Sequence, residues 1–320
     1  MRELCPRSYD VVERAELLRL RVSLFASACD ENPSVSVTIS QDPDIGIPGV
    51  VYDCAIVLAQ FVAHQVLAHE KEDTSASSKP TQKTTKILEL GAGTGTCGLL
   101  LASCCAAKGM PVHLTLSDRN ANALALASRN AASVRDQSPY GRLVTTQIRK
   151  YAFGEDPCCL RAPQNTRPPD IILASDVLYD PTSAFALAES LRAMLIGNDD
   201  RGAERVLDFH GDGNHQPDTD ANPPQPVCYL AYRPRDSSAH KTNAFGAFTK
   251  RLREIGLAAR EETVDARSNE TKIVTADAST ATPADDANET RENKWSVSFN
   301  VRDATARGLT ILRIEAGGRL

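Results

Sequence analysis

The sequence lacks the features that mark secreted, metal-binding and membrane-spanning proteins. Its nine cysteines form no CxxC pair, and an odd count with two adjacent doublets suits neither a disulfide framework nor a zinc site. The most apolar stretch, residues 54–68, is interrupted by Gln60, His64 and Gln65. The first twenty residues carry charges throughout. We therefore predict neither a membrane span nor a signal peptide.

A strong charge of one sign is also missing. The 36 Lys and Arg residues and 41 Asp and Glu residues leave a net charge of -5, with no dense basic run, so we expect no nucleic-acid partner. His64, His69 and His113 are scattered without ligand spacing, so no metal is expected. Reduced thiols favour a cytoplasmic location, and also a nuclear one.

What the chain does have is enough apolar material for a large core. Its 320 residues, of which 42% are hydrophobic, suffice for one large α/β domain. Short runs of Val, Ile and Leu alternate with helical stretches, a pattern typical of a mostly parallel sheet. Polar segments that are too rich in Ser, Thr, Pro, Asp and Asn to be buried are part of 30–48, 70–85, 197–226 and 261–293.

The apolar periodicity places the individual elements. The expected strands are 86–90, 112–116, 142–148, 170–174 and 227–233, with a last antiparallel pair at 257–264 and 310–315. The expected helices are 49–69, 95–107, 120–132, 183–195 and 243–255. Gly256 suits a left-handed helix cap, and residues 294–301 alternate like an edge strand.

The sharpest local feature is KILELGAGTGTCGLLLA, in which a buried strand runs into Gly91, Gly93 and Gly95 and then into a helix. Glycines let the backbone turn tightly and approach a nucleotide-like ligand closely. Gly93, Gly95 and Gly98 also satisfy a GxGxxG spacing, so this pattern alone leaves a nicotinamide cofactor open.

Two acidic residues accompany the glycine loop. Glu89 lies at the strand end, where a carboxylate repels a pyrophosphate but can pair with a cationic amino-acid group. This favours a sulfonium cofactor. Asp118 follows the next strand, in the position where a carboxylate accepts both ribose hydroxyls of an adenosine. Asp118 therefore supports adenosine binding of either cofactor.

Three motifs together resemble the seven-strand S-adenosylmethionine-dependent methyltransferases and, more narrowly, the family-16 protein-lysine methyltransferases. They are GVVYDCAIVLAQF (49–61), ILELGAGTGTCGLLLA (87–102) and ASDVLYDP (174–181). The resemblance covers roughly 48–260 and the last strand. It implies an α/β fold, namely a Rossmann-like seven-strand class I methyltransferase sheet with helices on both faces, and S-adenosyl-L-methionine as cofactor.

The resemblance also divides the chain. Residues 1–48 have no counterpart in the family and are expected to be a partly helical N-terminal extension. Residues 49–320 form the methyltransferase domain, with polar insertions near 70–85, 197–226 and 261–293.

The family pattern implies roles for particular residues. Asp176 and Tyr179, in the DxxY motif, are expected to meet a target lysine beside the sulfonium methyl group, and Ser175 belongs with the cofactor residues. Tyr52 stands where the family usually has a tryptophan near the methionine end of the cofactor. A second family tryptophan, near the adenine, is missing, and Tyr151 is the nearest aromatic.

Charged residues next to these motifs have more than one interpretation. Asp180 and Pro181 are expected to start a helix. Arg233 and Arg235 follow a strand whose loop commonly lines the substrate channel in similar enzymes. They are either contacts for an acidic partner surface or solvated loop charges.

The sequence thus predicts a monomeric S-adenosylmethionine-dependent protein-lysine N-methyltransferase. The form of ASDVLYDP and the last strand look most similar to the branch acting on translation elongation factor 2, and related branches modify chaperones. The alternatives are transfer to protein histidine, arginine or a small molecule, and a catalytically silent cofactor-binding scaffold. A nicotinamide-dependent oxidoreductase is the third option.

Overall fold

The computed structural model describes residues 17–23, 34–69, 84–160, 167–196, 225–233, 244–262, 270–275, 296–300 and 309–317. Arg235 and nearly all of the polar insertion 197–226 lie outside these residues.

A seven-stranded sheet forms the centre of the molecule, with the strand order β5-β4-β3-β6-β7-β11-β8. The five strands from β5 to β7 are parallel to one another, and β11 is antiparallel to both β7 and β8. The strands are β3 (Thr85–Leu90), β4 (Val112–Asp118), β5 (Val144–Lys150), β6 (Ile171–Ser175), β7 (Val227–Tyr232), β8 (Leu257–Glu261) and β11 (Thr310–Ala316). The predicted α/β class, the sheet and its last antiparallel pair are confirmed.

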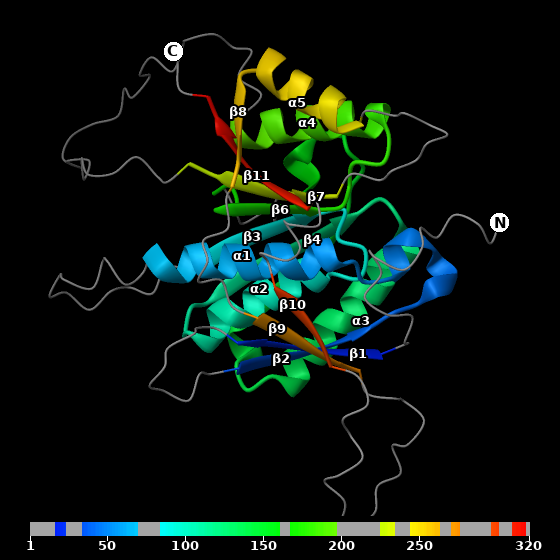
Figure 1. Ribbon diagram of the computed structural model, residues 1–320, viewed down its shortest axis with the longest axis vertical. Coiled ribbons are helices and arrows are strands. Elements are labelled where there is room, and N and C mark those ends of the chain that lie inside the picture. Colours follow the sequence, from blue (N-terminus) through cyan, green and yellow to red (C-terminus); the bar gives the residue numbers. More distant parts are fainter. Residues whose placement is uncertain are drawn as a thin grey trace, which may run out of the picture.

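Helices cover both faces of this sheet, as predicted (Figure 1). One face carries α1 (Asp53–His69), α2 (Thr96–Ala107) and α3 (Ala121–Gln137), and the other carries α4 (Pro181–Leu195) and α5 (Ala244–Glu254). Two short 3-10 turns, Gly141–Leu143 and Pro157–Leu160, flank β5.

The helix ends follow the local sequence signals. Asn120 caps α3 by accepting hydrogen bonds from the backbone N–H groups of Asn122 and Ala123. Asp180 caps α4 in the same way through the N–H of Ser183, with Pro181 as the first helical residue, which confirms the expected helix start. Gly256 has φ of 77°, so the left-handed conformation expected after α5 is present.

A second, four-stranded antiparallel sheet packs on α1, α2 and α3 from the side away from the main sheet (Figure 1). Its order is β10-β9-β1-β2. The strands are β1 (Leu17–Ser23), β2 (Ser34–Ser40), β9 (Glu270–Thr275) and β10 (Ser296–Asn300). The expected edge strand near 294–301 is β10, at the edge of this sheet.

The second sheet includes strands from the expected N-terminal extension and from a later polar insertion. Among the described residues of 1–48, helical structure is limited to two 3-10 turns, η1 (Pro43–Ile45) and η2 (Ile47–Gly49), and the main elements are β1 and β2. These strands bury alternate residues, which is the two-residue period of a sheet with one covered face. The buried residues are Leu18, Leu20, Val35, Val37 and Ile39. The later polar insertion contributes β9, the partner of β1.

Candidate functional site

A cavity of about 620 Å³ opens where four parallel strands end. Gly91 follows β3, Asp118 is the last residue of β4, Tyr151 follows β5, and Ser175 is the last residue of β6. Open α/β sheets bind ligands outside the carboxyl ends of their strands, and the volume lies within the range of small-molecule pockets. The remaining lining residues are Ile47, Pro48, Val50, Tyr52, Ala55, Ala92, Gly93, Thr94, Thr96, Arg119, Asn120, Ala152, Phe153, Val177, Tyr179, Asp180, Thr182, Ser183 and Ala186.

The glycine loop needs its glycines for both conformation and space. Gly91 and Gly93 have φ of 66° and 53°, a region that side chains disfavour. A Cβ atom on Gly93 would lie 2.9 Å from the carbonyl oxygen of Pro48, and one on Gly91 would lie 2.8 Å from Val177. Both glycines line the cavity. Gly95, the third predicted residue, has no place in the lining and instead precedes the first turn of α2.

Asp118 lines the cavity and braces its loop at the same time. Its Oδ2 accepts a hydrogen bond from the N–H of Gly93 at 3.0 Å, and its Oδ1 accepts one from the N–H of Asn120 at 2.8 Å. A carboxylate offers about four acceptor positions, so both oxygens can still accept a hydrogen bond from a ligand hydroxyl. The expected ribose-binding position is therefore chemically suitable for a diol.

Glu89 does not lie on the cavity, which corrects the expectation that it contacts the cofactor. Its carboxyl group is buried beneath α2, where Oε2 accepts a hydrogen bond from the N–H of Gly98 at 2.8 Å. A Cβ on Gly98 would lie 2.7 Å from this oxygen, so glycine permits the close approach. Burial raises the pKa of Glu89 to about 8, against the effect of the Gly98 hydrogen bond and with a contribution from Asp118. Glu89 is therefore mostly protonated near pH 7 and does not provide the anionic partner that the sequence indicated.

Three aromatic residues besides Tyr179 line the cavity, and they differ in how they are held. Tyr52, just before α1, is 8% exposed. Tyr151 is buried, and its hydroxyl lies 2.8 Å from Ser190 Oγ and 3.0 Å from the carbonyl oxygen of Glu155. Phe153, which the sequence interpretation passed over, is partly exposed beside Gly91. The sequence does carry a signal for Phe153, because the stretch YAF holds a second aromatic two positions after Tyr151.

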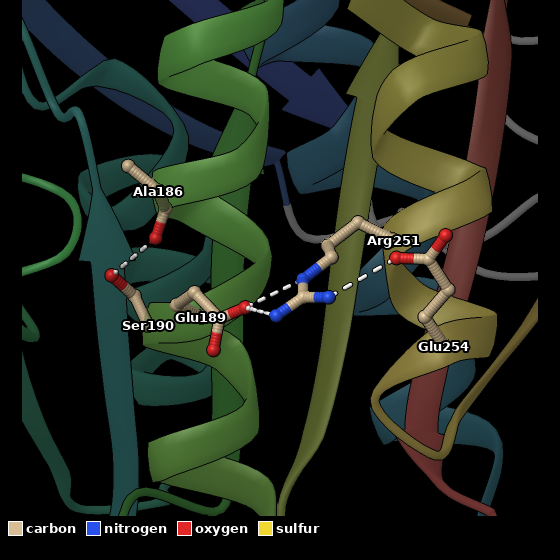
Figure 2. A network of polar contacts seen from close by, with 5 residues as sticks. All are labelled: Ala186, Glu189, Ser190, Arg251 and Glu254. Atoms are coloured by element: carbon tan, nitrogen blue, oxygen red, sulfur yellow. Dashed lines mark hydrogen bonds and ion pairs between the residues drawn. The ribbon is translucent and has the colours of Figure 1, made fainter.

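Ser190, inside α4, organises this aromatic corner. Its Oγ accepts hydrogen bonds from Tyr151 and from the N–H of Gly154, both at 2.8 Å. It donates to the carbonyl oxygen of Ala186 at 3.0 Å, as Figure 2 shows. Ala186 also lines the cavity. Nothing in the sequence singles out this serine, because a buried helical serine carries no local pattern.

The same part of α4 is tied to α5 on its outer side. Arg251 donates to Glu189 Oε1 through Nε at 2.7 Å and through Nη2 at 2.6 Å, and its Nη1 lies 3.1 Å from Glu254 (Figure 2). The guanidinium also lies 5.9 Å from the ring centre of Phe185. This network links α4 to α5 on the side of α4 away from the cavity.

The DxxY motif is divided between the cavity and the sheet. Tyr179 lines the cavity and is 44% exposed, and Ser175 also lines it. Asp176 is buried and absent from the lining, and its N–H donates to the carbonyl oxygen of Ala231 in β7. Its φ of 52° is unusual for a residue with a side chain. Asp176 thus turns the chain from β6 toward Tyr179, and the structure does not bring the two side chains together on the cavity.

Comparison with known proteins gives a family model that matches this chain. A model of a family described as lysine methyltransferase matches residues 31–201. The chain belongs to the lysine methyltransferase family. Membership confirms the predicted methyltransferase class, together with its cofactor S-adenosylmethionine.

A curated relative of this lysine methyltransferase family member is Protein N-lysine methyltransferase METTL21A of Danio rerio. It is 29% identical over 163 residues, which are 51% of this chain and 62% of the relative. The match therefore spans less than two thirds of that protein.

Solved structures with a similar fold include the CMeT domain of the citrinin polyketide synthase, with 14% identity, a TM-score of 0.43, and coverage of 82% of this chain and 52% of that one. The methyltransferase domain of bacterial CtHen1-C has 12% identity, a TM-score of 0.40, and coverage of 82% and 100%.

Arg233 in this family member is neither a solvated charge nor a free contact. Its Nη2 lies 2.5 Å from Asp53 Oδ2, and the two side chains are 13% and 6% exposed. The pair joins the start of α1 to the end of β7, because Asp53 is the first residue of that helix and Arg233 follows that strand. The sequence offers no signal for a pair 180 positions apart.

None of the helices among the described residues is both long and apolar enough to cross a membrane. In the same residues, no group of three or more His, Cys, Asp and Glu side chains is placed to hold a metal ion.

Proposed function

We propose that the chain is an S-adenosylmethionine-dependent protein-lysine N-methyltransferase whose reaction takes place in the cavity at the ends of β3 to β6. One observation carries this proposal: in a member of this family, a carboxylate suited to a ribose diol and an accessible tyrosine hydroxyl line the same cavity. These residues are Asp118 and Tyr179. The lysine acceptor is supported by the family description and by the relative's name.

The lining residues suggest how the cofactor is held. Asp118 accepts hydrogen bonds from the ribose hydroxyls, and the backbone of Gly91 and Gly93 lies against the neighbouring part of the cofactor. Phe153 would provide the surface for the adenine, since Tyr151 is buried and its hydroxyl is already hydrogen-bonded. Tyr52 presents its ring toward the sulfonium end, where cation–π attraction contributes about 0.5–2 kcal/mol.

When bound, S-adenosylmethionine would supply an electrophilic sulfonium methyl group; its transfer to a neutral amine would give a methylated ammonium and leave the neutral thioether S-adenosylhomocysteine. The protein's part is to present a neutral lysine. A lysine with a pKa near 10.4 costs about 4 kcal/mol to deprotonate at roughly pH 7.4, and loss of water in a narrow site offsets much of this. The Tyr179 hydroxyl positions the nitrogen, and Asp176 acts as a positioning residue by setting the turn that places Tyr179.

In the decisive experiment, the protein is incubated with a labelled methyl donor and a cytosolic extract that lacks the endogenous enzyme. Mass spectrometry then identifies the labelled residue. We expect label on lysine. Label on histidine, arginine or a small molecule would replace the proposed acceptor. Donor binding without any transfer would favour a scaffold. Preferential binding of a nicotinamide cofactor in a thermal-shift comparison would overturn the proposal.

The substrate protein and the cellular location of this methyltransferase are predictions from the sequence. A translation elongation factor or a chaperone is the expected substrate, and the experiment above also identifies the labelled protein. The expected cytoplasmic and nuclear location, and the monomeric state, are tested by fractionation and by sedimentation.

A further inference from the structure

One wall of the cavity comes from the segment between the second sheet and α1. Residues 41–52 leave β2, make the two 3-10 turns and reach α1, and they place Ile47, Pro48, Val50 and Tyr52 on the cavity. We refer to residues 41–52 as the N-terminal wall. The N–H of Asp42 donates to the carbonyl oxygen of Gly49 at 2.8 Å, so this wall is a closed loop rather than an extended linker.

A single buried side chain joins the start of this wall to the glycine loop. Asn130 in α3 has no solvent-accessible surface. Its Oδ1 accepts a hydrogen bond from the N–H of Ser40 at 2.8 Å, and its Nδ2 donates to the carbonyl oxygen of Ser40 at 3.0 Å. The same Nδ2 donates to the carbonyl oxygen of Thr94 at 2.9 Å. Ser40 ends β2, and Thr94 lies in the cavity lining.

The amide is the group that this position requires. Ser40 presents both an N–H and a carbonyl oxygen, and Thr94 presents a second carbonyl oxygen, so the side chain must accept once and donate twice. An asparagine amide does this without a charge, whereas an aspartate cannot donate unless it is protonated. An apolar residue would remove the partner of the buried Thr94 carbonyl and of two part-buried groups of Ser40. Both N–H groups of the Asn130 amide are therefore used, one for the Ser40 carbonyl and one for the Thr94 carbonyl.

We infer that Asn130 is a positioning residue for methyl-donor binding, because its amide holds the N-terminal wall in register with the glycine loop. The inference rests on the function proposed above. The second sheet would then support the cofactor site, because Ser40, which Asn130 binds, is the last residue of β2 and directly precedes the N-terminal wall. The close approach of Gly93 to the carbonyl oxygen of Pro48 shows that wall and loop leave little room for displacement.

A second polar contact holds the wall from within. Gln41, which is 5% exposed, accepts a hydrogen bond through Oε1 from the N–H of Val51 at 2.6 Å. Gln41→Met keeps the length of the side chain and removes this acceptor. It provides a second variant in case Asn130→Ala does not fold.

The test compares the dissociation constant for S-adenosylhomocysteine, measured by calorimetry, with the melting temperature of the apoprotein. For Asn130→Ala we expect a rise in Kd of about tenfold or more, and a smaller rise for Gln41→Met. In turnover assays the KM for the donor should rise while kcat at saturating donor stays near the wild-type value. Hydrogen exchange should accelerate at residues 41–52 and stay unchanged in α4.

Leu252→Ala is the matched control, because Leu252 is fully buried in α5 and lines no part of the cavity. It should lower the melting temperature without changing Kd. Wild-type affinity in both wall variants would overturn the inference and leave the proposed function intact. Equal losses of affinity in Leu252→Ala would also overturn it, because the effect would then be one of general stability. Wild-type protein that does not bind the ligand would instead refute the proposed function.

Discussion

The two faces of the seven-stranded sheet are covered in different ways. On one face α2 lies between the main sheet and the second sheet, and eleven of its twelve residues are buried. On the other face α5 has a single covered side, formed by Ala244, Phe248 and Leu252, and its outer side carries the Arg251 ion pairs (Figure 2). A helix covered on both sides needs apolar residues all around, whereas a surface helix needs only a stripe.

The cavity receives residues from both sides of the sheet, and these residues differ in burial. Asp118 belongs to the doubly covered side, is buried and braces the glycine loop. Tyr179 belongs to the singly covered side and is exposed. Functional residues on the first side should therefore support the fold as well as the ligand, and those on the second side should affect the reaction alone.

Leu100→Ala in α2 should have the largest effect on stability. Leu100 is completely buried, and truncation leaves a cavity that costs about 3–5 kcal/mol. Denaturant unfolding measures the change. Phe185→Ala on α4, where the ring is 42% exposed, should cost only about 0.5 kcal/mol. Similar losses in both variants would remove the contrast between the faces.

Asp118→Ala should weaken donor binding by about 100-fold, because both the ribose contact and the support for Gly93 are lost. The melting temperature should fall as well. Calorimetry and thermal unfolding measure the two effects. Asp136→Ala, which removes an exposed aspartate of α3, should change neither quantity, and unaltered affinity in Asp118→Ala would place the ribose elsewhere.

Tyr179→Phe should lower kcat by about 10- to 100-fold, because the hydroxyl that orients the lysine nitrogen is removed. Donor affinity and the melting temperature should stay at wild-type values, in contrast to Asp118→Ala. Tyr140→Phe, at an exposed tyrosine outside the cavity, is the control. Unchanged turnover in Tyr179→Phe would exclude this residue from the reaction.

Glu89→Gln should change how stability depends on pH. The folded-state pKa is raised from 4.5 to about 8, so the wild-type contribution is fully present below about pH 4.5 and is lost as pH rises through 8. Glutamine keeps an acceptor for Gly98 and does not titrate. The variant should gain roughly 1–3 kcal/mol relative to wild type between about pH 5 and 9. Parallel stability curves would contradict the burial of a titrating carboxyl group.

Arg251→Gln should have the smallest effect. The side chain is 32% exposed, and exposed ion pairs contribute little because water and salt screen them. We expect the melting temperature to fall by about 1 °C at low salt and less at high salt. A fall as large as that of Leu100→Ala would show that the outer network carries the packing of α4 and α5.

Some features of the site followed from the sequence because they are local. The strand leading into Gly91 and Gly93 and the acidic end of the next strand were found by pattern alone, since neighbouring parallel strands bring their carboxyl ends together. The start of α4 at Asp180 was equally clear, because capping involves residues within one turn. The alternation of apolar Leu18 and Leu20 in β1 is also visible in the sequence.

The tertiary structure alone decided the rest. It placed Glu89 under α2 rather than on the cavity, put Phe153 on the cavity beside a buried Tyr151, and paired Arg233 with Asp53. It also joined β1 to β9 across some 250 positions. A sequence determines which segments become strands and helices through contacts along the chain. Which side chain faces a cavity depends on packing between distant segments, and no local pattern records that.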